Sequence, residues 1–202
     1  MKVIRLIAGL GNPGPQYAAT RHNAGFQWLD RLCDEHNIVL RPDAKFHGRT
    51  GKLAKGERET LLLEPQTFMN LSGRSVAAIG RFYKLLPEEM LVVHDELDLP
   101  PGTARLKHGG GHGGHNGVRD IITQTGSGDF WRLRLGIGHP GHRDQVVDYV
   151  LRRPLLEENN LIAEAIGQSL KVIAQLLNGE FSVAMMKLHS KAKPPPTAGA
   201  AP

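Results

Sequence analysis

Hydrophobic and polar positions along this chain switch repeatedly between the spacing of strands and that of helices. The run "VIRLIAGL" (3–10) is apolar almost throughout and ends in "GNPGP", which predicts a buried strand followed by a turn. Later runs are apolar or alternate apolar with polar side chains, as strands do. Those predicted as strands are 45–53, 59–65, 90–100, 103–108 and 132–138.

Helical spacing separates the predicted strands. From Tyr17 onward, one stripe repeats at intervals of four, three and four residues: His22, Phe26, Leu29 and Cys33. Further helices are predicted over 70–86, with Ser72 as the N-cap, and over about 116–125. A long amphipathic helix is predicted from the stripe Ile162, Ile166, Leu170, Ile173 and Leu177. Strands that alternate with helices indicate an α/β domain.

Length and cysteine usage limit the organisation of the chain. A chain of 202 residues fits one domain, which we place over residues 1–189. Residues 190–202 contain "KPPPTAGAAP" and no aromatic residue, so they are predicted to be a disordered tail. The N-terminal apolar run is too short for a membrane span and is interrupted by Arg5. The single Cys33 excludes an internal disulfide, and we expect a cytoplasmic protein with no membrane partner.

The net charge of +5 is concentrated in one region. The segment 102–153 contains eight basic residues and only four acidic ones, Asp120, Asp129, Asp144 and Asp148. The basic residues are Arg105, Lys107, Arg119, Arg132, Arg134, Arg143, Arg152 and Arg153. Charge alone leaves two interpretations open, a solvated basic face or a binding surface for phosphates. An aromatic content of 5% argues against a stacking platform for single-stranded nucleic acid.

Three short motifs suggest chemistry that their surroundings do not favour. "GLGNPG" matches a dinucleotide-binding pattern, but Asp30 lies in a predicted helix and not at the end of the next strand. The loop histidines (His108, His112 and His115, with His139 and His142 nearby) could ligate a metal, yet flanking glycines leave them unheld. Cys33 lies on an apolar stripe, so it is not favoured as a nucleophile. We therefore predict neither a cofactor nor a metal.

Polar residues gather where the predicted strands end or helices begin, at Asn12, His22, Asn70, Asp95 and the pair His115 and Asn116. In α/β sheets, ligands bind beyond the carboxyl ends of the strands. An imidazole oriented by a carboxylate is a general base near neutral pH, and side-chain amides can donate to an oxyanion. A base and several amides without a nucleophile suggest direct attack of water on an acyl group.

Five motifs, in order and with compatible gaps, resemble those of the bacterial peptidyl-tRNA hydrolases. They are "GLGNPGPQYAATRHNAGF", "TFMNLSG", "HDELDLPPG", "GGGHGGHNG" and "RLRLGIGHPG", and the resemblance extends roughly from Val3 to His189. It implies a twisted mixed β-sheet flanked by α-helices, a monomer without metal, and hydrolysis of the ester that joins a peptide to the tRNA 3′ end. Such hydrolysis recycles tRNA from peptidyl-tRNA released by ribosomes.

The resemblance also implies roles for individual residues. His22 would activate water, Asp95 would orient His22, and Asn12 would help to stabilise charge on the carbonyl oxygen. The residues implied to bind the peptide and the 3′ CCA end are Tyr17, Phe68, Met69, Asn70, His115 and Asn116. The residues implied to bind phosphates of the acceptor stem are Lys107, Arg134 and Arg143, the last standing where relatives often have lysine. His108 and His112 receive no role.

Two other functions remain as alternatives. The first is an RNA-binding protein of the same fold without catalysis, although the presence of His22, Asp95 and the three asparagines argues against it. The second is a metal-dependent hydrolase that uses the loop histidines. For the hydrolase, a site lined by amides predicts a preference for substrates whose α-amino group is blocked.

Overall fold

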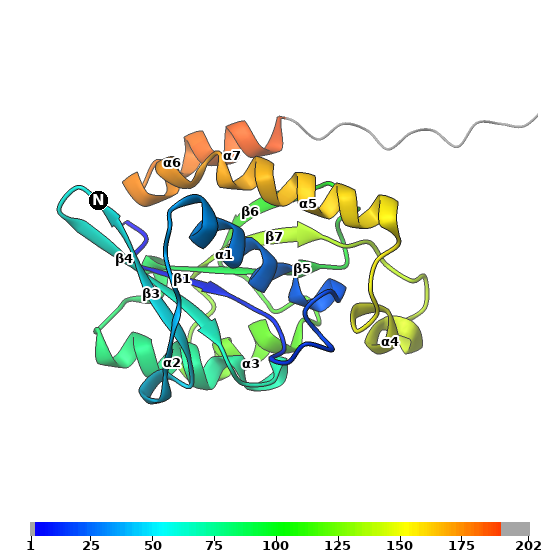
Figure 1. Cartoon of the computed structure of the whole chain (residues 1–202), viewed down its shortest axis with the longest axis horizontal. Helices are drawn as coiled ribbons and strands as arrows, with labels where there is room; N and C mark the ends of the chain where they lie inside the picture. Colours follow the sequence, from blue (N-terminus) through cyan, green and yellow to red (C-terminus); the bar gives the residue numbers. More distant parts are fainter. Residues whose placement is uncertain (1–2, 191–202) are drawn as a thin grey trace, which may run out of the picture.

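A seven-stranded sheet forms the centre of the computed structural model, which describes residues 3–190 (Figure 1). The strand order is β2-β3-β4-β1-β5-β7-β6. The strands are β1 (Leu6–Gly9), β2 (Arg41–Asp43), β3 (Gly48–Lys55), β4 (Arg58–Pro65), β5 (Met90–Glu96), β6 (Ala104–His108) and β7 (Trp131–Gly136). The short edge strand β2 was not predicted. All predicted strands form, with ends displaced by a few residues.

The sheet is mixed, as the resemblance implied. Strands β4, β1, β5 and β7 are neighbours and run parallel, whereas β2, β3 and β6 pair in antiparallel fashion at the two edges. The carboxyl ends of the four parallel strands therefore lie at one edge of the sheet. The segments that carry Asn12, Phe68 and Asp95 all leave the sheet at this edge.

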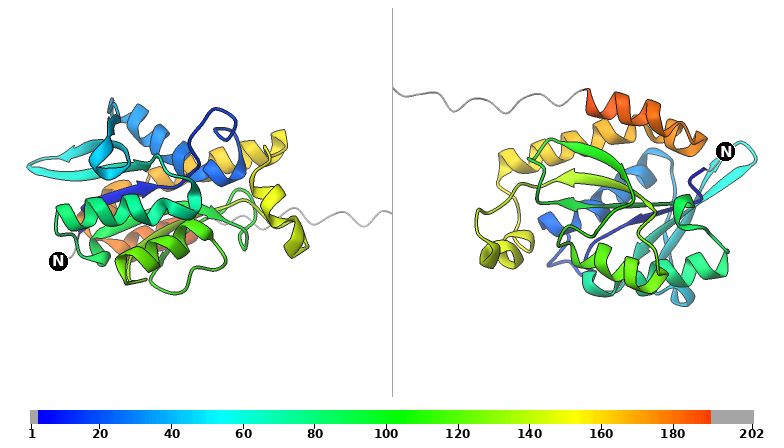
Figure 2. Two further views of the ribbon diagram at one scale, coloured as in Figure 1. Left: turned by 90° about the horizontal axis from the view of Figure 1, so that it is seen from below. Right: turned by 180° about the vertical axis from the view of Figure 1, so that it is seen from behind.

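Helices cover both faces of the sheet (Figures 1 and 2). They are α1 (Ala24–Glu35), α2 (Ser72–Phe82), α3 (Asn116–Thr125), α4 (Val146–Val150), α5 (Leu156–Leu170), α6 (Ile173–Asn178) and α7 (Phe181–His189). Alternate residues of β1 serve two separate cores, because successive side chains point to opposite faces. Ile7 packs with residues of α1 and α5, and Leu6 packs with residues of α2 and α3.

Three details of the predicted helices were wrong. The helix expected from Tyr17 begins only at Ala24, after a turn and the 3-10 helix Arg21–Asn23. Ser72 is not an N-cap: it is the first residue of α2, and its hydroxyl donates to the carbonyl of Met69 at 2.8 Å. The long helix around 162–177 is two helices, α5 and α6, separated by a turn at Lys171 and Val172.

The glycines of "GLGNPG" have a packing role. A Cβ atom on Gly9 would lie 2.5 Å from the carbonyl oxygen of Gly25, so glycine allows α1 to approach β1 closely. The next α-helix begins ten residues after Gly14, and Asp30 lies inside it, which does not match the strand-turn-helix geometry of a dinucleotide site. Among residues 3–190, no helix is both long and apolar enough to cross a membrane. The predicted tail falls outside the described residues, apart from Ser190.

Candidate active site

A cleft of about 410 Å³ opens at the carboxyl ends of the parallel strands. Nine residues singled out from the sequence line it: Asn12, Tyr17, His22, Phe68, Met69, Asn70, Asp95, His115 and Asn116. They come from the turn after β1, the 3-10 helix Arg21–Asn23, the segment after β4, the end of β5 and the start of α3. The structure therefore brings together segments that are as much as 104 residues apart in the sequence.

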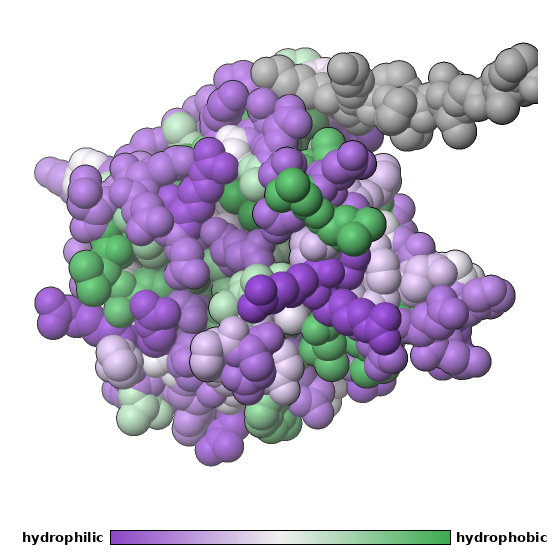
Figure 3. Space-filling view, turned by 45° about the vertical axis from the view of Figure 1, so that its right-hand side comes forward, coloured by the Kyte–Doolittle hydropathy of each residue, from purple (hydrophilic) through white to green (hydrophobic). Residues whose placement is uncertain are grey.

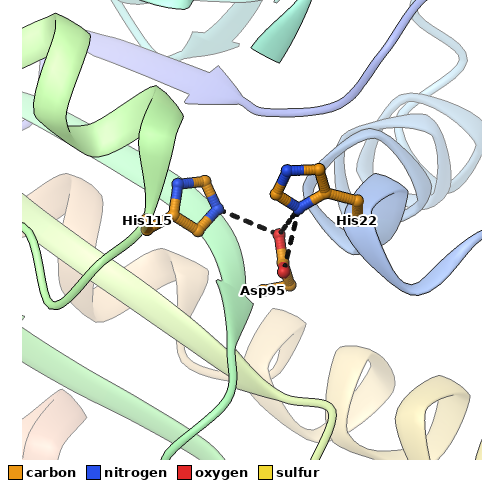
Figure 4. A group of neighbouring side chains, drawn as sticks. All are labelled: His22, Asp95 and His115. Carbon is orange, nitrogen blue, oxygen red and sulfur yellow. Dashed lines mark hydrogen bonds and ion pairs between the residues drawn. The ribbon is translucent and has the colours of Figure 1, made fainter. Parts of the chain in front are cut away.

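His22 and Asp95, which both line this cleft, form a hydrogen-bonded pair (Figure 4). The Nδ1 atom of His22 lies 2.9 Å from Oδ1 and 3.0 Å from Oδ2 of Asp95. A carboxylate only accepts hydrogen bonds, so Nδ1 carries the proton. The Nε2 atom of His22 has no hydrogen-bond partner within residues 3–190, and in the neutral ring it is the nitrogen that can accept a proton.

His115 contacts the same carboxylate from the other side (Figure 4). Its Nε2 atom lies 3.0 Å from Oδ1 of Asp95, and its Nδ1 atom accepts from the backbone N–H of Val118 at 3.3 Å. The second contact requires an unprotonated Nδ1, so Nε2 is the nitrogen that donates to Asp95. The sequence suggested only that His115 lines the cleft; its contact with Asp95 is a tertiary feature.

Burial and electrostatic interactions shift the pKa values of His22 and Asp95 in opposite directions. Burial lowers the pKa of His22, but the negative charge of Asp95 and its hydrogen bond outweigh burial, so the pKa lies above the ordinary 6.5. Burial raises the pKa of Asp95, but its electrostatic interactions and hydrogen bonds with His22 and His115 hold that pKa below its ordinary range. Asp95 is 2% exposed and remains ionised at neutral pH.

Asn12 is held by a residue that sequence reasoning missed, Asn23. The side chain of Asn23 accepts from the backbone N–H of Asn12 and donates to its carbonyl, each at 2.9 Å. The side-chain oxygen of Asn12 accepts from the backbone N–H of Met69 at 2.7 Å. This contact leaves the amide nitrogen of Asn12 available in the cleft. The sequence signal for this contact was the asparagine directly after His22, because a buried side-chain amide needs hydrogen-bond partners.

His94 is a second residue that the sequence did not reveal. It is 3% exposed, and its ring meets the ring of His115 at 4.7 Å between centroids. Its Nδ1 atom donates to the carbonyl of Asp95 at 2.7 Å, and its Nε2 atom is buried without a partner within residues 3–190. Burial, together with the nearby His115, lowers the pKa of His94 to about 3, so its ring is neutral.

The predicted phosphate-binding residues lie outside the cleft lining. Lys107 is exposed on the edge strand β6, and Arg134 on β7 forms an ion pair with Glu96 at 3.6 Å. Arg143 is exposed in the 3-10 helix that precedes α4. Lys107 lies opposite Arg132 in the antiparallel register, which brings Lys107 and Arg134 to one face of the β6–β7 pair.

Arg132 holds the glycine-rich loop beside the cleft. Its guanidinium donates to the carbonyl oxygens of Gly110, Gly111 and Gly128. Four glycines of the loop have positive φ angles, which other residues rarely adopt: Gly109, Gly110, Gly113 and Gly114. His112 has a local role, because its Nδ1 atom accepts from the backbone N–H of Gly114 at 3.0 Å. The loop ends at His115, the N-cap of α3.

Helix α4 supplies an apolar wall that the sequence analysis did not identify. Val146, Val147, Val150 and the adjacent Leu151 line the cleft, and Val147 is 63% exposed. Figure 3 brings this end of the molecule forward and shows apolar residues in small patches among hydrophilic ones. The apolar run "VVDYVL" could have indicated this helix, but it is too short to establish a helical period.

One group of side chains among residues 3–190 could hold a metal ion: His22, Asp95 and His115, whose ligand atoms lie within 4.8 Å of one another. Within that part of the chain, the other histidines that the sequence suggested as metal ligands belong to no group able to hold an ion. A tetrahedral zinc site needs bonds of about 2.0 Å to each ligand. In this structure the ligand atoms of both histidines lie 2.9 and 3.0 Å from Oδ1 of Asp95, at hydrogen-bond distance.

Known proteins are similar to this chain along almost all of its length. The family model of the peptidyl-tRNA hydrolases matches residues 6–196. A peptidyl-tRNA hydrolase of Methylobacillus flagellatus is 60% identical over 96% of this chain and 100% of its own length. One of Nitrosospira multiformis is 56% identical over 93% and 98%. The crystal structure of the enzyme from Acinetobacter baumannii has a TM-score of 0.90 and 47% identity, covering 93% of this chain and 95% of its own.

Proposed function

Because this chain belongs to the peptidyl-tRNA hydrolase family, we propose that His22, Asp95 and the cleft amides carry out its hydrolysis of peptidyl-tRNA. The chain is an enzyme that hydrolyses the ester of peptidyl-tRNA in translation, and it is not a non-catalytic RNA-binding protein. The observation that carries the proposal is the hydrogen bond of 2.9 Å from Nδ1 of His22 to Asp95, which leaves Nε2 in the cleft as an acceptor.

In the proposed reaction, Nε2 of His22 removes a proton from water while the oxygen attacks the ester carbonyl carbon. Asp95 holds the imidazole in the tautomer that leaves Nε2 unprotonated, and its charge stabilises the imidazolium that forms. The same imidazolium then returns the proton to the departing 3′ oxygen of the ribose. His115 supports this step because its hydrogen bond of 3.0 Å fixes the orientation of the carboxylate.

Asn12, Asn70 and Asn116 are proposed to donate hydrogen bonds to the carbonyl oxygen as it becomes negative, and to hold the peptide. Asn12 is the most firmly positioned of the three, through its contacts with Asn23 and Met69. Amide partners suit a substrate with a blocked α-amino group, because a free ammonium cannot replace the peptide N–H and carbonyl. N-acetylated aminoacyl-tRNA should therefore react faster than free aminoacyl-tRNA, and equal rates would contradict this selectivity.

Lys107, Arg134 and Arg143 are proposed to bind phosphates of the acceptor stem while the 3′ CCA end, near Tyr17 and Phe68, enters the cleft. Support comes from the position of Lys107 and Arg134 on one face of β6 and β7, next to the glycine-rich loop. We further infer that the protein acts in the cytoplasm as a monomer. Sedimentation of the protein with and without tRNA would test the monomeric state.

The proposal is tested by hydrolysis of N-acetylaminoacyl-tRNA with EDTA present. Wild type should turn over, whereas His22→Ala should lose at least about a hundredfold in rate and retain tRNA binding. His36→Ala provides a matched control, because His36 is an exposed histidine at the end of α1. Turnover by His22→Ala at the wild-type rate would rule out the assigned base. A wild type that becomes inactive only in EDTA would instead favour the metal-dependent alternative.

A further inference from the structure

Arg21, the residue before the proposed base, lies buried between the catalytic segment and the apolar wall of the cleft. It is 7% exposed, and its Nη1 atom lies 3.2–3.3 Å from the carbonyl oxygens of Tyr149, Arg152 and Arg153. Its Nη2 atom donates to the carboxylate of Glu158 at 2.6 Å. A single guanidinium thus contacts the end of α4, the turn after α4, and the first turn of α5.

Three further contacts keep α4 in place. The guanidinium of Arg21 stacks on the ring of Tyr149 at 4.1 Å from its centroid, and the Tyr149 hydroxyl donates to the carbonyl of Ile137 at 2.6 Å. The backbone N–H of Arg21 donates to the carbonyl of Arg152 at 3.2 Å. Helix α4 has only five residues, too few to hold its own conformation without tertiary support. Val150 packs into the core, and Arg21 and Tyr149 supply the polar contacts that hold this helix in position.

We propose that Arg21 is a positioning residue that sets the distance between the α4 wall and His22, and thereby determines which peptide side chains the cleft accepts. This inference rests on the proposed function, because it takes the cleft as the site of the peptidyl group. Arg21 and His22 are consecutive residues of one 3-10 helix. The contacts of Arg21 with α4 therefore also fix the position of the α4 wall relative to His22.

The consequence for the substrate depends on the size of its last amino acid. A large apolar side chain buries surface against Val147 and Leu151, which are 63% and 39% exposed in the free protein. Glycine at the same position buries little. If the wall moves away, the large side chain loses contacts that it makes both in the bound substrate and in the transition state. Such a loss raises KM and leaves kcat nearly unchanged.

The test compares one tRNA acylated with N-acetylphenylalanine and the same tRNA acylated with N-acetylglycine. Arg21→Met keeps the approximate length of the side chain and removes its donors and charge. We expect KM for the phenylalanyl ester to rise by about tenfold and KM for the glycyl ester by less than about twofold. The pH profile of kcat should stay that of the wild type, because the contacts of His22 with Asp95 are unchanged.

Arg31→Met is the matched control. Arg31 also donates to a carbonyl of α5, that of Ala163 at 3.1 Å, but it does not contact α4 in the described structure. Both KM values should remain those of the wild type in this variant. If Arg21→Met does not fold, the ratio of the two KM values is measured on Arg21→Lys, which retains the charge near Glu158 and lacks the planar group that reaches three carbonyls.

Equal increases in the two KM values, or no increase, would overturn the assignment of Arg21. A shifted pH profile would also overturn it, because it would place the effect on the base and not on the wall. His22→Ala separates the two proposals. If His22→Ala is inactive while the ratio of KM values is unchanged by Arg21→Met, only the Arg21 inference fails. If His22→Ala hydrolyses both esters normally, the proposed function itself fails.

Discussion

Replacing Asp95 with asparagine would test the proposed base most directly. Asp95→Asn keeps the size of the side chain and removes the negative charge that lies 2.9 Å from Nδ1 of His22. Burial, which lowers the pKa of His22, would remain, while the negative charge that raises it would be lost. The pKa of His22 should therefore fall below 6.5, and the acidic limb of the rate profile should move to lower pH.

The rate at the plateau should fall at the same time. The charge of Asp95 stabilises the imidazolium in the transition state, and at about 4 Å between charge centres this attraction is about 4 kcal/mol for an effective dielectric constant of about 20. A loss of this size reduces kcat by about a thousandfold. The two effects are separable, because one changes the position of the profile and the other its height.

The assay is the pH dependence of kcat/KM on N-acetylaminoacyl-tRNA from pH 5 to 9. Asp34→Asn is a suitable control, since Asp34 is an exposed carboxylate on α1 and the substitution is chemically identical. Its profile should match the wild type. If Asp95→Asn keeps its rate within about tenfold of the wild type and its profile does not move, the reasoning about the pair is wrong.

Three other variants test separate parts of the structure. Arg134→Ala should raise KM and reduce the slope of log KM against log salt by about 0.9, the value for one phosphate contact; an unchanged slope would contradict that contact. Burial lowers the pKa of His94 to about 3, so the stability that the neutral His94 contributes to the folded protein is complete above pH 6.5. That contribution is lost as the pH falls, because His94 becomes protonated first in the unfolded chain. Chemical denaturation at pH 7 and pH 5 measures the free energy of unfolding, which should fall between these two values by about 2 kcal/mol less in His94→Asn than in the wild type. An equal fall in the two proteins would refute this. Asn23→Ala removes two buried hydrogen bonds to the backbone of Asn12 and should lower both stability, by about 1–3 kcal/mol, and kcat. Wild-type values of both would show that Asn12 does not depend on this support.

Several elements could be predicted from local pattern because each depends on its own residues. The strand at 3–10 and the side of α1 that carries Leu29 and Cys33 follow from apolar spacing, which places one side of each segment in a core. The break between α5 and α6 was missed because the apolar stripe continues across Lys171 and Val172. Helix α4 and strand β2 are too short for a period to be recognised.

The sequence by itself determined the alternation of strands and helices, the glycines of the loop and the residue types able to act as base and amides. The resemblance of its motifs to a family implied the roles of individual residues. Only the tertiary structure decided that one carboxylate, Asp95, serves both His22 and His115, that Asn23 holds Asn12, and that Arg21 holds α4. These contacts join residues far apart in the chain. Their geometry follows from the packing of the whole sheet, because the parallel strands deliver their carboxyl ends to one edge.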